Sequence, residues 1–227
     1  MAVRALVFDV FGTLVDWRSG VADAFQANGA WGDPYELADA WRARYRPILA
    51  EVNEGARQWG SFDELHLATL DDLLAERGAE LSIEQRRRLV DAWHRLNPWP
   101  DVRAGLEALR GERVVAMLSN GHVALLVDLA RHGDLRFDCV LSAELAQAYK
   151  PAPEAYLTAA RLLAVDAAEL MLVAAHPWDL DGARRAGLMT AFVDRPLEYG
   201  PGSPARADPD ADHAVGDLLE LAERLAG

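Results

Sequence analysis

The chain has 227 residues, which is enough for one large domain or two modest ones with a buried core. Hydrophobic residues make up 51% of the chain and charged residues 26%, as is typical of a soluble globular protein. The net charge of −13 argues against a nucleic-acid-binding protein, because such proteins present a basic face to phosphates. A small anionic substrate remains compatible with this charge, since a few local cations can reverse the field inside one pocket.

The cysteine content and the polar residues of the longest apolar stretch indicate the cellular location of the protein. A single cysteine, Cys139, cannot form an intramolecular disulfide, so we expect a cytoplasmic protein. The apolar stretch 114–130 contains four polar residues, so we expect no membrane span and no membrane partner. These residues are Ser119, Asn120, His122 and Asp128.

Apolar runs alternate with helix patterns along most of the chain. The first run, RALVFDV (4–10), is rich in Val and Phe and is bounded by Gly12, which indicates a strand buried on both faces. Strands that alternate with helices predict a parallel sheet covered on both faces. We expect strands at 4–10, 113–119, 137–143, 169–175, 190–193 and 213–215, and helices at 101–111, 122–133, 153–165 and 178–187.

Residues 16–98 interrupt this alternation, because they show helix patterns but no convincing strand. We therefore predict an α/β protein in which residues 1–15 and 99–227 form a Rossmann-like parallel sheet core and residues 16–98 form an inserted four-helix cap. A cleft between two such bodies is a favoured place for a ligand site. The Pro- and Gly-rich segment 198–212 is expected to be a surface loop. The cap helices are expected at about 17–28, 34–52, 61–77 and 83–96.

Asp9 is the first candidate for chemistry, because it ends the first predicted strand. Ligands of open parallel sheets bind at the carboxyl ends of the strands. Gly12 turns the backbone there, and Thr13 can orient the carboxylate. Taken alone, Asp9 is interpreted equally well as a residue that caps a turn.

Polar residues also follow three other predicted strands. Each has an ordinary explanation as a helix N-cap, a loop residue or a solvated surface charge. Lys150 is the only lysine among 23 Lys and Arg residues, which weakens its explanation as a surface charge. One acid, one cation and several hydrogen-bonding groups that converge on one sheet edge indicate an active site. The residues are Ser119 and Asn120 in LSNG, Lys150 in YKP, and His176 and Asp179 in AAHPWD.

The motifs DVFGT, SNG, YKPxPxxY and WDxxGA, in this order and spacing, resemble the haloacid dehalogenase superfamily over nearly the whole chain. DVFGTLVDW, AWRARY (40–45) and HPWD resemble its L-2-haloacid dehalogenase branch, known as type II. The resemblance implies a Rossmann-like core with a four-helix cap, catalysis without a cofactor or metal, and a homodimer. It implies a small-molecule haloacid as substrate and a halide ion as product.

The resemblance also implies a role for each matching residue. Asp9 is the nucleophile, Arg42 takes the departing halide, and Asn120 lies beside that halide. Ser119 and the backbone near Phe11 hold the substrate carboxylate. The remaining implied members are a polar network of Lys150, Tyr156 and Asp179, and an apolar wall that Phe11 shares with Trp178 and, from the cap, Trp59.

Phe11 occupies the position at which phosphatases of the same superfamily carry the second aspartate of an Asp-x-Asp motif. That aspartate protonates a leaving alcohol, whereas a halide leaves without protonation. A phosphate dianion near Asp9 would also need a metal to screen two anions, whereas a haloacid monoanion needs only a positive pocket, which Arg42 and Lys150 can supply. The sequence therefore favours hydrolysis of a carbon–halogen bond. The alternatives are a Mg²⁺-dependent phosphatase, a hydrolase of another carbon–heteroatom bond in a small carboxylic acid, and a non-catalytic protein of the same fold.

The expected reaction has two steps. Asp9 attacks C2 of a short L-2-haloacid and expels halide, which gives an aspartyl ester. Water then attacks the ester carbonyl carbon and releases a 2-hydroxy acid with inverted configuration at C2. Lys150 suits this chemistry because a compact ammonium can keep Asp9 ionised and can lose a proton when desolvated, whereas arginine is bulkier and permanently charged.

The loop after the fourth strand departs from the dehalogenase pattern, which carries Ser and Asn where this chain has Ala174, Ala175 and His176. How the hydrolytic water is held is therefore open. His176 can act as a base or a water anchor, because imidazole titrates near neutrality, or it can merely fill the pocket wall. A bulky His176 beside Trp178 can also shrink the halide pocket, which adds haloacetates, including fluoroacetate, to the candidate substrates.

Overall fold

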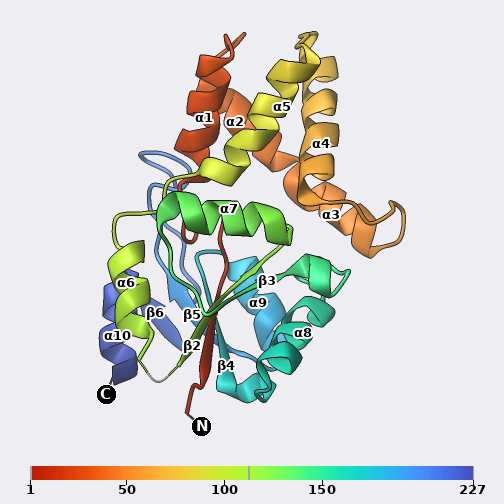
Figure 1. The fold of residues 1–227 in the computed structure, drawn as a ribbon. Coiled ribbons are helices and arrows are strands. Elements are labelled where there is room, and N and C mark those ends of the chain that lie inside the picture. The colour runs from red at the N-terminus through yellow and green to blue at the C-terminus, as the bar shows by residue number, and fades with distance from the viewer. Residues whose placement is uncertain (1, 112, 227) are drawn as a thin grey trace.

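A six-stranded, fully parallel sheet forms the centre of the molecule, in the order β3-β2-β1-β4-β5-β6 (Figure 1). The computed structural model describes residues 2–111 and 113–226. The α/β class and the Rossmann-like sheet predicted from the sequence are confirmed. The strands are β1 (Ala5–Phe8), β2 (Val114–Ser119), β3 (Cys139–Ser142), β4 (Leu170–Ala174), β5 (Met189–Val193) and β6 (His213–Val215).

Strand β1 lies in the middle of the sheet, between β2 and β4. Every residue of β1 and β4 is buried, as their continuous apolar sequences predict. From β1 the chain builds outward to β2 and β3 on one side, and then crosses back to β4 on the other. The carboxyl end of β1 is therefore the switch point of the sheet, where open α/β folds bind their ligands.

Helices cover both faces of the sheet. Leu6 and Phe8 point into one core, which α6, α7 and α10 share, whereas Ala5 and Val7 point into another, which α8 and α9 share. Helix α10 was not predicted. The bounds are α6 (Val102–Leu109), α7 (Val123–Gly133), α8 (Pro153–Leu163), α9 (Pro177–Arg185) and α10 (Leu218–Ala226), with short 3₁₀ turns η1 (Trp93–Arg95), η2 (Ala143–Leu145) and η3 (Ala167–Glu169).

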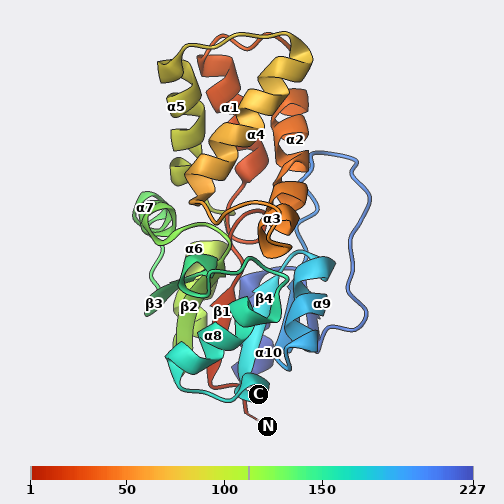
Figure 2. The ribbon, with the colours of Figure 1, turned by 90° about the vertical axis from the view of Figure 1, so that its right-hand side faces the viewer.

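Five helices from the inserted segment lie together beyond the carboxyl edge of the sheet, and we call them the helical layer (Figures 1 and 2). The prediction of four helices is wrong, because the segment 34–52 folds as two helices that separate at Arg44. Pro47 has no N–H to donate to the Ala43 carbonyl, and its ring would clash with that carbonyl in a continuous helix. The domain limits at 15/16 and 98/99 stay a prediction. The helical layer comprises α1 (Trp17–Ala27), α2 (Pro34–Ala43), α3 (Tyr45–Asn53), α4 (Phe62–Arg77) and α5 (Ile83–Ala92).

The long connection between β5 and β6 runs up the side of the molecule towards the helical layer (Figure 2). The prediction that 198–212 is a surface loop is wrong for Asp208, which is 4% exposed and pairs with Arg184, and for Glu198, which is 1% exposed. A carboxylate so deeply buried needs hydrogen-bond and charge partners. The partners of Glu198 lie in the site described below.

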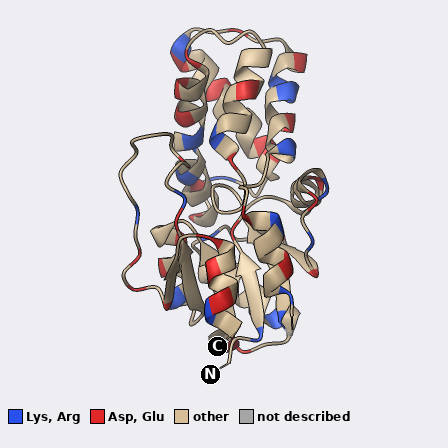
Figure 3. Cartoon of the chain, turned by 90° about the vertical axis from the view of Figure 1, so that its left-hand side faces the viewer, with Lys and Arg blue, Asp and Glu red and all other residues tan. Residues whose placement is uncertain are grey.

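Acidic and basic residues are interspersed over the helices on the face that Figure 3 shows. Ion pairs such as Arg18–Asp39 and Arg86–Asp71 join neighbouring segments of the helical layer. Within the described part of the chain, no helix combines the length and the apolar character needed to cross a membrane.

Helices α6 and α10 approach closely at Gly105. A Cβ atom added there would lie 2.3 Å from the Cβ atom of Leu218, so α10 would have to shift. Although alanine is the better helix former, we expect Gly105→Ala to lower the free energy of unfolding by roughly 1–3 kcal/mol, measured by urea denaturation. Gly32→Ala is the control, because a Cβ atom there meets nothing within 4 Å. Equal stability of the two variants would contradict the close packing of α6 on α10.

Candidate active site

Asp9 follows β1 directly and is 6% exposed. Its Oδ1 accepts a hydrogen bond from Lys150 Nζ at 2.9 Å. Its Oδ2 accepts one from Thr13 Oγ1 at 2.7 Å and lies 3.1 Å from His176 Nδ1. Thr13 Oγ1 in turn accepts a hydrogen bond from the backbone N–H of Ala175. This contact holds the Thr13 hydroxyl where it can orient the Asp9 carboxylate, as the sequence predicted. Oδ1 is the oxygen with fewer partners, so it is the better placed of the two to act as a nucleophile.

The charges around Asp9 decide its protonation state. Burial opposes the ionised form, but the positive charges of Lys150 and His176 outweigh burial and hold the pKa of Asp9 well below its usual range. Asp9 is therefore a carboxylate at neutral pH. An ionised carboxylate with a free lone pair is the state that nucleophilic attack requires.

Lys150 is 2% exposed and lies between two carboxylates, those of Asp9 and Asp179. Its backbone is held by Asn120, whose Oδ1 accepts the Lys150 N–H at 2.7 Å and whose Nδ2 donates to the Lys150 carbonyl at 3.3 Å. Burial opposes the ammonium form, but Asp179 and Asp9 raise the pKa of Lys150 above its usual value. The expectation that Lys150 can lose a proton is therefore wrong, and it acts as a fixed positive charge.

Asp179 is completely buried at the start of α9. One of its oxygens accepts from Lys150 and the other accepts from the Tyr156 hydroxyl at 2.6 Å. Burial and the nearby charge of Asp9 raise the pKa of Asp179, while Lys150 opposes this change. The structure thus places Tyr156 behind Asp179, where it positions the carboxylate. Tyr156 does not line the cavity where a substrate would bind.

His176 connects Asp9 to a residue that was not predicted. Its Nε2 lies 2.9 Å from Glu198 Oε1, while its Nδ1 faces Asp9. Glu198 also accepts from Trp17 Nε1 at 3.0 Å. A side chain at Gly12 would collide with this pair, since a Cβ atom there would lie 2.2 Å from Glu198 Oε1. The result is a continuous buried row of Asp9, His176 and Glu198.

Two carboxylates determine the charge of His176. Burial favours the neutral ring, but Glu198 and Asp9 outweigh it and raise the pKa of His176 to about 9. In the resting protein His176 is therefore an imidazolium at neutral pH. Nothing in the sequence identified Glu198 as a partner of His176, because the two residues meet only in the folded chain.

Arg42 lies at the C-terminal end of α2 among aromatic rings. Its guanidinium carbon is 4.1 Å from the ring centre of Tyr45, 5.3 Å from that of Trp17 and 5.8 Å from those of Phe11 and Trp93. Among the described residues, no group accepts a hydrogen bond from its buried Nη1. A cation with a free donor inside an aromatic box is a suitable site for a monatomic anion.

The two polar residues at the end of β2 have different surroundings. Ser119 is 1% exposed, and its Oγ accepts the Gly121 N–H, so its hydroxyl proton remains available for a ligand. Asn120 donates to the Tyr45 hydroxyl at 2.9 Å as well as to Lys150. Asn120 therefore approaches the Arg42 box only through Tyr45, and its amide is already engaged in holding the Lys150 loop.

The apolar residues predicted for the wall divide into two groups. Phe11 stacks on Phe62 with ring centres 5.3 Å apart, and Trp178 stacks on His176 at 5.9 Å. Trp59, in contrast, stacks on Tyr149 at 4.3 Å and lines no part of the cavity beside Arg42. That cavity has a volume of about 240 Å³, and its walls include Arg42, Tyr45, Arg46, His176 and Trp178.

A parallel sheet that holds an ionised carboxylate at its switch point, beneath a helical layer and beside a cavity lined by arginines, is typical of an α/β hydrolase. Residues 3–187 match the haloacid dehalogenase-like hydrolases. The chain belongs to this family.

Individual relatives and solved structures are similar to this chain over nearly its whole length. The chain is 32% identical to (S)-2-haloacid dehalogenase 1 of Pseudomonas sp. (strain CBS-3), over 98% of this chain and 96% of the relative. A crystal structure of an L-2-haloacid dehalogenase is 46% identical, covers 99% of both chains and superposes with a TM-score of 0.93. A defluorinating L-2-haloacid dehalogenase is 38% identical, with a TM-score of 0.93 over 99% of this chain and 96% of that one.

The raised pKa of His176 predicts how stability depends on pH. Its pKa rises from an ordinary 6.5 to about 9 on folding, so the folded state binds the proton more tightly. This contribution is complete below about pH 6.5 and is lost as the pH rises through about 9. We expect the free energy of unfolding to fall by on the order of 1–3 kcal/mol over that window, measured by urea denaturation at a series of pH values. His176→Gln should flatten the dependence, and an unchanged slope in this variant would contradict the assignment.

Proposed function

We propose that the protein hydrolyses short L-2-haloacids to 2-hydroxy acids through an aspartyl ester on Asp9, with inversion at C2 and without a metal. The observation that carries the proposal is an ionised Asp9 beside a cavity in which Arg42 has an unpaired donor. Membership of the haloacid dehalogenase-like family and the similarity to L-2-haloacid dehalogenases support it.

In the first step, Asp9 Oδ1 attacks C2 of the bound haloacid from the side opposite the halogen. The electron pair of the carbon–halogen bond leaves with the halide, which Arg42 receives in its aromatic box. Phe11 supplies apolar surface where a phosphatase would need an acid, and a departing halide needs no proton. The free hydroxyl of Ser119 binds the substrate carboxylate.

In the second step, the histidine acts as a base. Esterification removes the negative charge of Asp9, so one of the two carboxylates that hold the proton on His176 is lost. The Nδ1 proton can then pass to solvent water in the cavity that His176 lines, which leaves a neutral ring. Glu198 keeps Nε2 protonated, so Nδ1 faces the ester and takes a proton from a water that attacks the Asp9 carbonyl carbon. The Asp9 Cγ–O bond to the substrate then breaks, and the product oxygen takes up the carboxyl proton.

Asp179 is a weaker candidate for this base. Both of its oxygens already accept hydrogen bonds, and it is completely buried. His176, in contrast, lines the cavity. Asn at this position in the dehalogenase pattern can hold a water but cannot take its proton, so His176 gives this chain a candidate base at a position where the pattern has none.

The size of the cavity favours small substrates. Its volume of about 240 Å³ is below the range of about 300–1,000 Å³ for sites that hold drug-sized ligands, and His176 and Trp178 form part of its wall. We include haloacetates among the substrates, with fluoroacetate as the most demanding, and the similarity to a defluorinating L-2-haloacid dehalogenase supports this inclusion. We also propose that the helical layer acts as a cap domain, and that the protein is a cytoplasmic homodimer, as the resemblance to the family implies.

The activity is tested by halide release from chloro-, bromo- and fluoroacetate and from L-2-chloropropionate, with EDTA present throughout. We expect release of halide in EDTA and its loss in Asp9→Asn, because an amide is a poor nucleophile. Magnesium-dependent release of phosphate from phosphate esters, with no release of halide, would contradict the proposal. Single turnover in ¹⁸O-water should put label into the Asp9 peptide, since water attacks the carboxyl carbon and not C2.

Glu198→Gln is expected to slow hydrolysis of the ester and to leave its formation largely intact. Without the carboxylate, His176 is a weaker base, and general-base catalysis contributes on the order of 10²–10⁴-fold. The ester should therefore accumulate on Asp9, which rapid quenching and mass spectrometry of the intact protein would detect.

Arg206→Gln is the matched control, because Arg206 contacts Glu198 at Oε2 and leaves the bond between Oε1 and His176 in place. We expect this variant to release halide at close to the rate of the unmodified protein. Slowed ester formation with no accumulated ester in Glu198→Gln would contradict the role given to the His176–Glu198 pair.

A further inference from the structure

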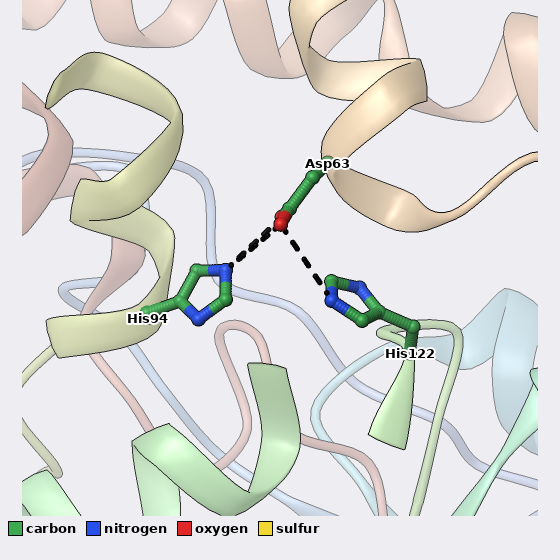
Figure 4. Close-up of side chains that lie close together, drawn as sticks. All are labelled: Asp63, His94 and His122. Carbon is green, nitrogen blue, oxygen red and sulfur yellow. Dashed lines mark hydrogen bonds and ion pairs between the residues drawn. The ribbon is translucent and has the colours of Figure 1, made fainter. Parts of the chain in front are cut away.

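Asp63, His94 and His122 converge where the helical layer meets the sheet core (Figure 4). Asp63 is in the first turn of α4, His94 is in η1, and His122 immediately precedes α7. His94 Nε2 lies 3.1 Å and 3.2 Å from the two Asp63 oxygens, and His122 Nε2 lies 3.6 Å from Oδ2. One ligand atom from each residue lies within 4.8 Å of the others, and all three side chains are half-buried.

The orientation of His94 leaves a lone pair in this cluster. Its Nδ1 lies 2.8 Å from Asp128 Oδ2, and a carboxylate can only accept, so Nδ1 carries a proton. Whenever the ring is neutral, the lone pair of Nε2 faces the Asp63 carboxylate. Two acceptors about 3 Å apart require a cation between them, either a proton or a metal ion.

A metal ion accounts for more of the geometry than a proton does. A proton can join His94 to Asp63, but it leaves His122 Nε2 at 3.6 Å, which is beyond hydrogen-bonding distance. Ligands of a tetrahedral Zn²⁺ ion, with bonds of about 2.0–2.1 Å, lie about 3.4 Å apart, close to the distances of both histidines from Asp63.

We propose that Asp63, His94 and His122 bind a divalent transition-metal ion, with the chemistry of Zn²⁺, that ties the helical layer to the sheet core. Two imidazoles and one carboxylate are a ligand set that zinc accepts, with water in the fourth position. Asp128 completes the arrangement, because metal-bound histidines usually donate their other N–H to a carboxylate. The ion is structural and takes no step in the reaction.

The neighbours of the three ligands connect this site to the cavity. Phe62, which precedes Asp63, stacks on Phe11. Trp93, which precedes His94, contacts the edge of the Phe11 ring at 5.7 Å. A bound ion would therefore fix both aromatic side chains that support Phe11, and it would stabilise the folded protein because the unfolded chain does not present the three ligands together.

The test begins with protein stripped by EDTA and then freed of the chelator. We expect calorimetric titration with ZnCl₂ to give one site per chain, and Co²⁺ to give the visible absorption bands of a low-symmetry site. Zn²⁺ at about a hundred times its Kd should raise Tm by roughly 5–10 °C.

Variants locate the ion. His122→Asn should abolish the site, and Asn remains a good residue to precede a helix. Asp128→Asn should weaken binding on the order of 10–100-fold, since it removes only the partner of His94. His132→Gln is the control for adventitious binding by surface histidines, and it should bind Zn²⁺ like the unmodified protein.

Each outcome is decisive. No binding of Zn²⁺ or Co²⁺ by the stripped protein would show that a proton alone joins His94 to Asp63, and the proposal would fail. Equal loss of binding in His132→Gln and His122→Asn would place the ion elsewhere and would also overturn it. The Co²⁺ spectrum of the unmodified protein gives an answer even where a variant fails to fold.

Discussion

The placement of one ammonium group between two buried carboxylates is the constraint on which the site depends. Burying ions is expensive, and their attraction compensates only when geometry and further hydrogen bonds are good. Lys150 meets this condition because Asn120 holds its backbone and Tyr156 holds the far side of Asp179. A compact ammonium fits between Asp9 and Asp179 at 2% exposure, where a planar guanidinium would need more room. The space and the charge between the two carboxylates thus explain why this position carries the one lysine of the chain. They do not support the expectation that Lys150 releases a proton.

His176 is the second buried cation of the site, and its protonation state depends on the charge of Asp9. In the resting protein, Lys150 and His176 together stabilise three carboxylates, those of Asp9, Asp179 and Glu198. In the proposed reaction the ester removes one of these negative charges, and it does so beside His176. The same event that completes the first step therefore lowers the affinity of His176 for its proton and prepares the base for the second. In the proposed reaction, the loss of this charge converts an electrostatic partner of Asp9 into a general base.

The sequence predicted features that follow from local patterns. The strands, the place of Asp9 at the end of the first strand and the polar strand ends all depend on apolar runs followed by turns, and the structure has them. The break between α2 and α3 has a sequence signal in Pro47, which the prediction of one helix over 34–52 did not use. Glu198 could not be predicted, since its burial depends on a contact with His176 and on the missing side chain of Gly12, both distant in sequence. Trp59 was assigned to the substrate wall by resemblance alone, and packing placed it on Tyr149.

Glu198 also explains why the helical layer matters to the chemistry. Its carboxylate bonds to Trp17, the first residue of α1, and to His176 in the core, so it joins the layer to the loop after β4. Arg42, from the same layer, brings the unpaired donor for the halide. The proposed nucleophile, Asp9, belongs to the core. Arg42, the proposed hydrogen-bond donor to the halide, belongs to the helical layer, and Glu198, which holds the proposed base, belongs to the long loop beside it. Both steps of the proposed reaction therefore depend on contacts among the core, the helical layer and the long loop.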